Sequence, residues 1–309
     1  MLILKDLDAL PEPYAGGVIA IGNFDGVHRG HQALIARVRT LAKTRAAKAG
    51  VLIFEPHPRA FFRPDDDHFE ITPLPRKLEL LDSFGLDLAA VRSFNRALSE
   101  LSAEDFIEQV LQEWLKVAHV VVGYDFFFGH KRSGTPETLK AIGLTHGFGV
   151  DVIAPQAEAG ETFSSSAIRA KLSAGNVAGA ARDLGTWWRV RGPVVGGAQR
   201  GTPMGFPTAN VVMPKGTALG HGIFAVRVVV DGTRYDAAAY LGTRPTFDDG
   251  KPVLEVFLLD FSGNLYGKDI DVIFIAHIRP DRKFDSTEAL IAQMEVDCDD
   301  ARKVLAAAD

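Results

Sequence analysis

The pattern of apolar and polar positions changes once along the chain, near residue 186. Before that point, short apolar runs at 18–21, 51–54 and 120–122 indicate buried strands, and stretches with an apolar residue every three or four positions separate them. Strands and helices in alternation favour parallel, right-handed strand–helix–strand units. The first part of the chain is therefore predicted to be an α/β domain, a parallel sheet with flanking helices.

The helix predicted directly after residue 31 shows this pattern most clearly. Its apolar residues share one helical face: Leu34, Ile35, Val38, Leu41 and Ala42. A glycine is common just past the end of a helix, so we expect Gly50 to end this one. Further helices are expected over 76–85, 102–115, 136–146 and 176–185.

After residue 186, apolar and polar residues alternate, and β-branched runs are separated by glycines. The predicted strands are 187–190, 222–230, 234–240, 253–261 and 269–275. Five or six short strands joined by turns, with no helix between them, indicate an antiparallel barrel or sandwich. A helical pattern returns at 285–308, where D-S-T-E is typical of a helix start. The expected domains are residues 1–185 and 186–309.

Composition limits the class of protein. The chain has 309 residues, 47% of them hydrophobic and 24% charged, as in a globular protein with more than one core. A net charge of −5 gives no electrostatic basis for general nucleic-acid binding. The single cysteine, Cys298, excludes an intramolecular disulfide framework, which is typical of a reducing cytoplasm. No apolar run approaches the ~20 residues of a membrane span, and the first residues lack a signal-peptide pattern.

We therefore expect a cytoplasmic protein with small-molecule substrates and with neither a membrane nor a nucleic acid as partner. A monomer or a weak homo-oligomer is expected.

The stretch 18–31 has the richest chemistry. After the apolar run, Gly22 and Gly26 indicate a tight loop, and His28 and His31 follow where a helix begins; the loop residues are Gly22, Asn23, Phe24, Asp25 and Gly26. Residues at i and i+3 share a helix face, so both imidazoles point the same way. A strand, a glycine loop and a helix N-terminus together form an anion site suited to phosphate. The alternatives are half of a metal site, which needs a third ligand, or polar residues at a helix start.

The sequence H-R-G-H after a strand resembles the H-x-G-H signature of the nucleotidyltransferase superfamily. The longer string G-N-F-D-G-V-H-R-G-H resembles the FMN adenylyltransferase half of the prokaryotic bifunctional riboflavin kinase/FAD synthetase family. This resemblance implies a Rossmann-like nucleotidyltransferase domain. It also implies that His28 and His31 contact ATP phosphates and stabilise charge as pyrophosphate leaves.

Two further segments of the first domain are candidates for flavin binding. In F-E-P-H-P-R, His57 and Pro58 form either a rigid turn or, as the resemblance implies, part of the nucleotide site. In G-Y-D-F-F-F-G, the candidates Asp125, Phe126 and Phe128 either cap the core or border an aromatic ligand. The family has a similar G-x-D/N-F-x-F-G segment, with a basic residue more often at the position of Phe127.

The segment F-S-S-S-A-I-R closes the first domain. One of Ser164, Ser165 and Ser166 is expected to cap a helix, and Arg169 lies within its first turns, where an arginine forks to phosphate oxygens. The segment resembles the S-S/T-x-x-R motif of nucleotidyltransferases, with Ser166 where threonine is common. The resemblance implies a second phosphate clamp.

The second domain opens with a glycine-rich loop. Its candidate phosphate-binding residues are Gly192, Gly196, Arg200, Gly201 and Gly205, although plain hairpin turns use glycines too. Thr208 and Asn210 alternate on an extended segment and so face one way, as oxygen ligands suited to Mg²⁺. The sequence P-T-A-N after such a loop resembles the riboflavin kinase signature.

Glu255 is the candidate acceptor of a hydroxyl proton. It lies mid-strand in V-L-E-V-F, where spacing alone favours an outward-facing residue, whereas the resemblance places the catalytic glutamate at this position. The chain departs from many relatives at Thr202–Met204 of the glycine loop and at Tyr240. The resemblance implies a six-stranded antiparallel β-barrel with a C-terminal helix.

The resemblance covers nearly the full length and predicts two reactions. One is phosphorylation of riboflavin to FMN by ATP and Mg²⁺, and the other is adenylylation of FMN to FAD with release of pyrophosphate. Two alternatives remain open from the residues: an FMN adenylyltransferase whose barrel only binds flavin, and a non-catalytic flavin-sensing protein.

Overall fold

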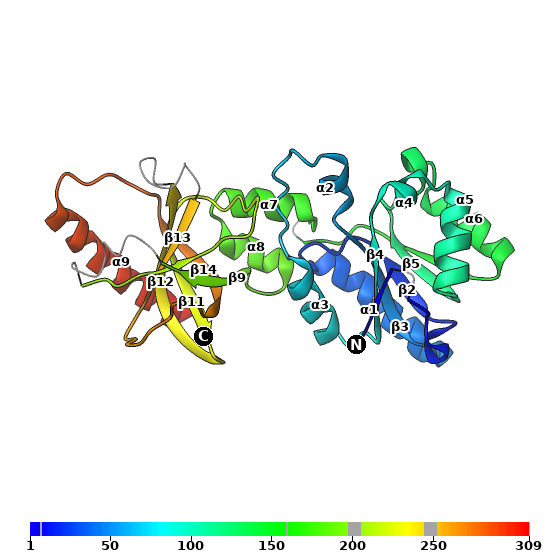
Figure 1. The fold of residues 1–309 in the computed structure, drawn as a ribbon, viewed down its shortest axis with the longest axis horizontal. Helices are drawn as coiled ribbons and strands as arrows, with labels where there is room; N and C mark the ends of the chain where they lie inside the picture. Colours follow the sequence, from blue (N-terminus) through cyan, green and yellow to red (C-terminus); the bar gives the residue numbers. More distant parts are fainter. Residues whose placement is uncertain (7, 159, 197–204, 244–251, 309) are drawn as a thin grey trace. The chain divides into compact units, whose positions relative to one another are not determined.

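The computed structural model describes residues 1–309 except 7, 159, 197–204, 244–251 and 309 (Figure 1). The chain divides into two compact units, Met1–Ser165 and Ser166–Asp309. Each unit has its own sheet, and the two are described separately. Among the described residues, no helix is long and apolar enough to cross a membrane.

A parallel sheet of six strands forms the centre of the first unit (Figure 1). In spatial order its strands are β1 (Leu2–Lys5), β4 (Leu88–Ser93), β3 (Ala49–Glu55), β2 (Val18–Ile21), β5 (His119–Gly123) and β6 (Gly149–Ile153). Every neighbouring pair is parallel. The predicted runs at 18–21, 51–54 and 120–122 are therefore three adjacent strands, β2, β3 and β5.

Helices cover both faces of this sheet. The larger ones are α1 (Arg29–Arg45), α3 (Leu74–Ser83), the π-helix η2 (Phe106–Trp114) and α6 (Pro136–His146). The shorter ones are η1 (Glu12–Tyr14), α2 (Pro58–Phe62), α4 (Arg96–Glu100), α5 (Ala103–Asp105) and η3 (His130–Arg132). A small hairpin of β7 (Ala157–Glu158) and β8 (Glu161–Thr162) precedes the end of the unit.

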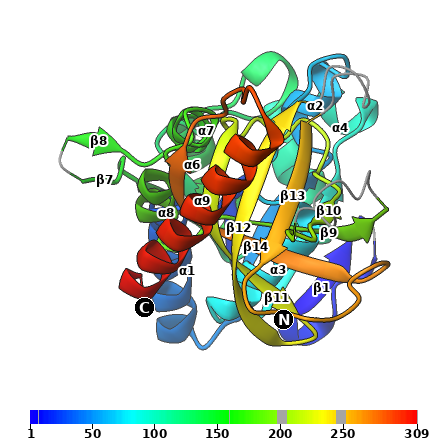
Figure 2. The same cartoon turned by 90° about the vertical axis from the view of Figure 1, so that its left-hand side faces the viewer.

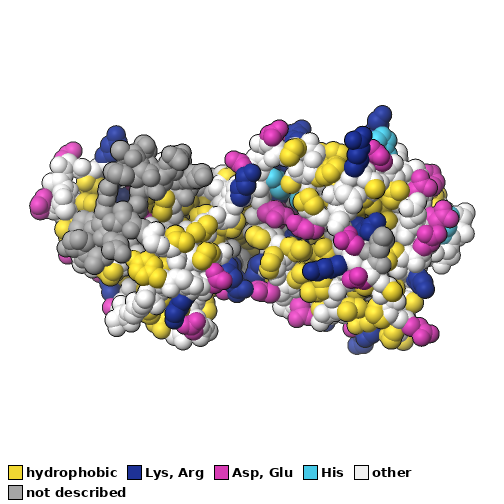
Figure 3. All heavy atoms as spheres, viewed as in Figure 1, with side chains coloured by type: hydrophobic (Ala, Val, Ile, Leu, Met, Phe, Trp, Pro, Cys, Tyr) yellow, Lys and Arg dark blue, Asp and Glu magenta, His cyan; other side chains and the backbone are white. Residues whose placement is uncertain are grey.

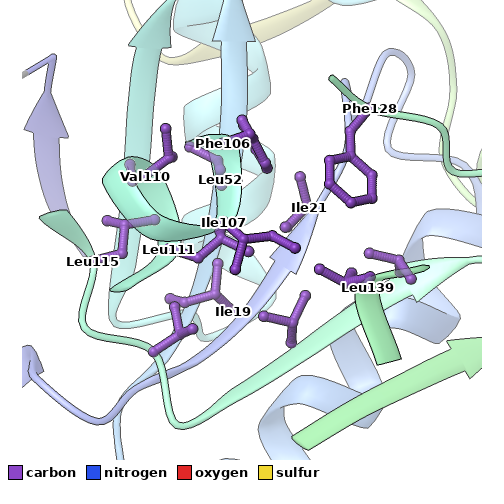
Figure 4. Packing of buried hydrophobic residues seen from close by; sticks show 14 of the residues in the cluster. Ile19, Ile21, Leu52, Phe106, Ile107, Val110, Leu111, Leu115, Phe128 and Leu139 are labelled. Carbon is purple, nitrogen blue, oxygen red and sulfur yellow. The ribbon is translucent and has the colours of Figure 1, made fainter. Parts of the chain in front are cut away.

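Successive residues of β2 point into two different cores. Ile19 and Ile21 pack with η2 and α6 residues on one face (Figure 4), and Val18 and Ala20 pack with α1 and α3 residues on the other. All four side chains are at most 1% exposed. A strand that is buried on both faces has a continuous run of apolar residues. This run, at 18–21, is the pattern from which the strand was predicted.

The expectation that Gly50 ends the first helix is wrong. That helix, α1, ends at Arg45, and Ala46 takes the left-handed conformation at its C-terminus with φ 50°. Gly50 lies inside β3, where a Cβ atom would come within 2.8 Å of the Ile19 side chain and 3.0 Å of Leu88 Cβ. Close packing between central strands, rather than a helix stop, explains this glycine.

The second unit begins with two helices and continues as a closed barrel. The helices are α7 (Ser165–Ser173), whose first residue is the last of the first unit, and α8 (Val177–Leu184). Around the barrel the strands are β10 (Ala209–Val211), β13 (Pro252–Leu258), β12 (Thr233–Thr243), β11 (Gly222–Val230), β14 (Asp269–Arg279) and β9 (Arg189–Val195). All pairings are antiparallel. This confirms the predicted antiparallel barrel of six strands.

The C-terminal helix α9 (Thr287–Ala307) packs along the outer wall of the barrel (Figure 2). Its buried residues Cys298 and Ala301 pack in one cluster with Ala225 and Ala238 of β11 and β12. The small alanine side chains let the helix axis come close to the strands. The Ser286 hydroxyl accepts from the Ala289 N–H at 3.1 Å, which confirms the helix start predicted from D-S-T-E.

On the face shown in Figure 3, acidic, basic and apolar side chains are interspersed over the coloured residues. Such a surface matches the small net charge of −5.

Candidate active sites

Three of the predicted segments of the first unit follow three adjacent parallel strands. The loop with His28 follows β2, the segment with His57 follows β3, and the segment 124–128 follows β5. Carboxyl ends of parallel strands meet at one edge of a sheet, which is where ligands of such sheets bind. The topology therefore brings these segments to one edge of the first unit.

The two histidines lie together at the start of α1. His28 is the N-cap residue, and its Nδ1 accepts a hydrogen bond from the backbone N–H of His31 at 3.4 Å. The two rings are stacked, with centroids 3.7 Å apart and planes inclined by 22°. The expectation that both imidazoles share a face is confirmed. Because Nδ1 of His28 is an acceptor here, the proton of the neutral ring is on Nε2.

Gly30 separates the two histidines and permits their stacking. A Cβ atom at this position would come within 3.0 Å of Cε1 and Nδ1 of His28 and 3.4 Å of the Phe163 carbonyl oxygen. The third residue of H-R-G-H is thus small because the His28 ring and the chain before α7 occupy the space beside it.

The loop between β2 and α1 has a strained backbone. Phe24 has φ 48°, Gly26 has φ 85° and Val27 has φ 46°. Glycine adopts this region without cost, but a β-branched residue rarely does. Strain of this kind is typical of sites where the backbone is held for a ligand.

Asp25 holds this loop to two distant parts of the unit. Its carboxylate accepts from the N–H of Thr72 at 3.0 Å and of Ile71 at 3.3 Å, and its side chain is 1% exposed. Its carbonyl oxygen accepts from the Ser165 hydroxyl at 2.8 Å. The structure thus joins the first motif to the S-S-S-A-I-R segment, and the Ser165 hydroxyl serves this bond.

Burial determines the protonation state of His31. Its Nδ1 is buried and has no hydrogen-bond partner among the residues that the structure describes. Burial, followed by the charges of His28 and Lys77, lowers the pKa of His31 well below its usual value. The imidazole is therefore neutral at pH 7 in the free protein.

Lys77 was not among the predicted site residues, although its charge acts on His31. It lies in the apolar stripe of α3 and is 1% exposed. The available signal in the sequence was a lysine three residues after Leu74 and four before Leu81, on the core side of a helix.

The predicted flavin-binding residues have different environments. His57 is the N-cap residue of α2, its Nδ1 accepts from the Arg59 N–H at 3.1 Å, and its ring lies 4.5 Å from that of His68. Pro58 is the first residue of α2. Asp125 is exposed at the end of β5.

Phe126 and Phe128 stack with ring centroids 5.4 Å apart. Phe128 is 7% exposed and belongs to the core (Figure 4), which agrees with the core-capping interpretation. Phe126 packs against the same cluster. Phe127 is 44% exposed, and the guanidinium of Arg132 lies 4.6 Å from its ring centroid.

The remaining residues of the S-S-S-A-I-R segment lie around the start of α7. Ser164 directly precedes the helix, and Ser166 and Arg169 follow on it within the second unit. Arg169 is partly buried.

The barrel brings Thr208, Asn210 and Glu255 together. Asn210 of β10 is paired with Glu255 of β13, and the Thr208 hydroxyl donates to Oε2 of Glu255 at 3.3 Å. Glu255 is half-buried, between the buried Leu254 and Val256. The interpretation as an outward-facing residue of an alternating strand is therefore correct, and the carboxylate faces the same side as the Thr208 hydroxyl.

Tyr240 extends this polar row to the next strand. It is paired with Glu255 across β12 and β13, and its hydroxyl donates to Oδ2 of Asp281 at 3.0 Å. Tyr240, where the chain departs from many relatives, is thus a neighbour of the candidate proton acceptor Glu255.

The glycine-rich loop is described only at its ends. Gly192 lies inside β9, where a Cβ atom would come within 2.4 Å of the Val212 carbonyl oxygen, so strand packing already requires a glycine. At Gly196 a Cβ atom would meet no described atom within 4 Å, and Gly205 has φ 86°. Arg200, Gly201 and the departure at Thr202–Met204 lie outside the described residues.

The donors at Thr208, Asn210 and Glu255 are hydroxyl, amide and carboxylate oxygens. Oxygen donors of this kind suit Mg²⁺ rather than a transition metal. In the part of the chain that the structure describes, no group of three His, Cys, Asp or Glu side chains is placed to hold a metal ion.

Comparison with known proteins finds a different family model for each part of the chain. A family model described as FAD synthetase matches residues 11–167, and one described as riboflavin kinase matches residues 184–305. The chain is 38% identical over 307 residues to the bifunctional riboflavin kinase/FMN adenylyltransferase of Pseudomonas fluorescens, a match that covers 99% of this chain and 98% of that protein. The protein of the same description from Escherichia coli K12 is 37% identical over 299 residues, 96% of each chain.

A solved structure also matches over nearly the whole chain. It is described as a macrolide-efflux protein from Streptococcus pneumoniae, with a TM-score of 0.88, 28% sequence identity and coverage of 98% of this chain and 99% of that one. This description differs from those of the two relatives above, which are more similar in sequence.

Proposed function

The chain belongs to the family of bifunctional riboflavin kinases/FMN adenylyltransferases, and from this premise we propose how its residues perform the two reactions. Both activities are those of the family. The FAD synthetase model matches the first half of the chain, and the riboflavin kinase model matches the barrel. The substrates are riboflavin, FMN and ATP, and the products are FMN, FAD, ADP and pyrophosphate. The first unit forms FAD and the barrel forms FMN.

The stacked pair of His28 and His31 at the start of α1 carries the proposal for FAD formation. A phosphate oxygen of FMN attacks the α-phosphorus of ATP, and the bond from that phosphorus to the bridging oxygen of pyrophosphate breaks. The attacking phosphate is already an anion, so no general base is required. The two imidazoles and the N-terminal N–H groups of α1 stabilise the negative charge that moves onto pyrophosphate.

The other residues proposed for FAD formation position the reactants. Gly22, Asn23 and Gly26 let the loop backbone approach the phosphates, and Asp25 holds that loop in place. Arg169 and the serines before it form the second phosphate clamp. For the flavin we propose contacts with the segments that contain His57 and Phe126; Pro58, Asp125 and Phe128 shape those segments.

Glu255 carries the proposal for FMN formation. Its carboxylate accepts the proton of the riboflavin 5′-hydroxyl as that oxygen attacks the γ-phosphorus of ATP, and ADP leaves. The Thr208 hydroxyl, 3.3 Å away, orients the carboxylate. Thr208 and Asn210 supply oxygen ligands to Mg²⁺, which neutralises phosphate charge when it is bound. As phosphate-binding residues of the barrel we propose Gly192, Gly196, Arg200, Gly201 and Gly205.

A product assay tests both reactions. The purified protein is incubated with riboflavin, ATP and Mg²⁺, and flavins are separated by chromatography over time. FMN followed by FAD is expected, and omission of Mg²⁺ with added chelator should abolish FMN formation. A protein that converts added FMN to FAD but leaves riboflavin unchanged would contradict the kinase assignment. One that makes FMN but never FAD would contradict the assignment of the first unit.

We also propose that the protein acts in the cytoplasm as a monomer or weak homo-oligomer. A single, buried cysteine agrees with a reducing compartment. Light scattering after size-exclusion chromatography tests the oligomeric state, and a stable large assembly would contradict it.

A further inference from the structure

Lys77 lies on the core-facing side of α3. Leu74 precedes it by three residues and Leu81 follows by four, and residues at these spacings share one helix face. Both leucines pack in the cluster that contains Phe24 and Val27 of the site loop. Lys77 is 1% exposed and is one of the largest fully buried side chains of the protein. Lys77 therefore lies on the side of α3 that packs against the cluster with the loop between β2 and α1.

The ammonium group of Lys77 has no counter-charge in the described part of the chain. The nearby carboxylates of α3 pair elsewhere, Glu79 with Arg76 and Asp82 with the N-terminal ammonium group. Among the described residues, no ion pair and no side-chain hydrogen bond involves Lys77. Burial of an ammonium group without an anion is unfavourable for folding. A methionine would fill the same space without this cost, so a lysine here requires a reason other than stability.

Two observations relate Lys77 to the start of α1. The carboxylate of Asp25 binds the N–H groups of Ile71 and Thr72, and α3 begins two residues later at Leu74, so the site loop and the helix are held together. The charge of Lys77 is also one of the causes that lower the pKa of His31. His31 in turn has a buried Nδ1 with no partner among the described residues.

We propose that Lys77 is a further catalytic residue of the first unit, whose ammonium group binds a phosphate oxygen of ATP beside His31. During FAD formation the bond between the α-phosphorus and the bridging oxygen breaks, and its electron pair leaves on pyrophosphate. Lys77 stabilises that charge, and no proton transfer is required. This inference rests on the proposed function of the first unit.

The test compares Lys77→Met with Lys140→Met. The second variant removes the same charge from an exposed position on α6. For Lys77→Met we expect the rate of FAD formation from FMN to fall about 100-fold, with FMN formation from riboflavin unchanged. We also expect pyrophosphate to raise the unfolding temperature of wild type and Lys140→Met but not of Lys77→Met. Without ligand, Lys77→Met should unfold at the wild-type temperature or above.

A merely structural lysine gives a different result. A lowered unfolding temperature without ligand, together with normal stabilisation by pyrophosphate, would overturn the proposal. So would FAD formation within threefold of wild type. If Lys77→Met does not fold, Lys77→Gln replaces it, and normal stabilisation of that variant by pyrophosphate would overturn the proposal.

Failure of this inference and failure of the proposed function are distinguishable. Wild-type protein that makes no FAD from FMN contradicts the function proposed for the first unit. Wild-type protein that makes FAD, together with an equally active Lys77→Met variant, contradicts only the role of Lys77.

Discussion

His28 has three roles in the free protein, and each uses a different part of the residue. Its backbone is the last position before α1, its Nδ1 accepts from the His31 N–H, and its ring stacks on that of His31. An N-cap is usually a short polar residue whose oxygen accepts a backbone hydrogen bond. Here Nδ1 of His28 is the acceptor, and this fixes the tautomer of the ring. In the neutral ring the proton is therefore on Nε2.

Replacement of either histidine tests this arrangement. For His28→Ala and His31→Ala we expect FAD formation from FMN to fall by about 100- to 1,000-fold, because each imidazole donates to charge that develops in the transition state. FMN formation from riboflavin should remain, because the barrel has its own site. Chromatography of the flavins measures both rates in one reaction. Equal loss of both activities in a well-folded variant would contradict the assignment.

The lowered pKa of His31 predicts a pH dependence of stability. In the unfolded chain an imidazole takes up a proton below about pH 6.5, whereas folded His31 stays neutral to lower pH. The unfolded state then binds more protons, so the free energy of unfolding falls as the pH drops below that value. We expect His31→Gln to reduce this fall between pH 7 and 5.

Thermal unfolding at each pH measures the effect. His146→Gln is the matched control, since His146 is exposed on α6. An acid sensitivity of His31→Gln equal to that of the wild type would contradict the buried, neutral state of His31.

At the scale of elements, each site is built where two or three elements meet. In the first unit, the loop after β2 is fixed through Asp25 to the chain before α3 and through Ser165 to the start of α7. In the second, the three-residue strand β10 pairs with both β9 and β13, which aligns Asn210 with Glu255. Short elements thus position the reactive groups, and long ones supply the cores.

The start of α1 provides a test of this positioning. In Gly30→Ala, the added Cβ would come within 3.0 Å of the His28 ring, so that ring must move from its stacked position. We expect FAD formation to fall at least about 10-fold, as small displacements of catalytic groups do. The free energy of unfolding should change little, because the helix preference of alanine over glycine, about 1 kcal/mol, offsets the cost of moving the ring. FAD formation at the wild-type rate would show that the ring can move without loss.

At the scale of the whole molecule, each of the two units contains its own sheet and core. The parallel sheet is buried on both faces, and the barrel packs its own helix on the outer wall. No described residue is proposed to serve both reactions. The two activities should therefore be separable by single substitutions.

Glu255→Gln provides the reciprocal to the histidine variants. We expect FMN formation to fall at least about 100-fold, the usual effect of losing a proton acceptor, while FAD formation from added FMN continues. Glutamine has nearly the same shape as glutamate, and Asn210 and Thr208 are unchanged, so the Glu255→Gln variant should fold normally. The control is a mixture of Glu255→Gln and His31→Ala proteins, which should convert riboflavin to FAD through released FMN. Failure of that mixture would contradict the separation of the sites.

Much of this protein is determined by the sequence itself, because local physics is sufficient there. The buried run at 18–21 and the apolar stripe after residue 31 each need only their own residues to define a strand and a helix. The alternation after residue 186 similarly predicts an antiparallel barrel or sandwich. Motif order identified the family, and the i, i+3 spacing of His28 and His31 predicted that their imidazoles point the same way.

The tertiary structure decided what depends on residues far apart in the sequence. Gly50 has two local interpretations, and only the neighbouring strands make it a close-packing residue of β3. Asp25 finds its partners 46 and 47 residues later, and nothing in the loop itself indicates them. Lys77 looks like an ordinary helix lysine until packing buries it beside the site loop. Burial and long-range hydrogen bonds arise only when separate segments meet, so the environment of each catalytic group is a property of the folded chain.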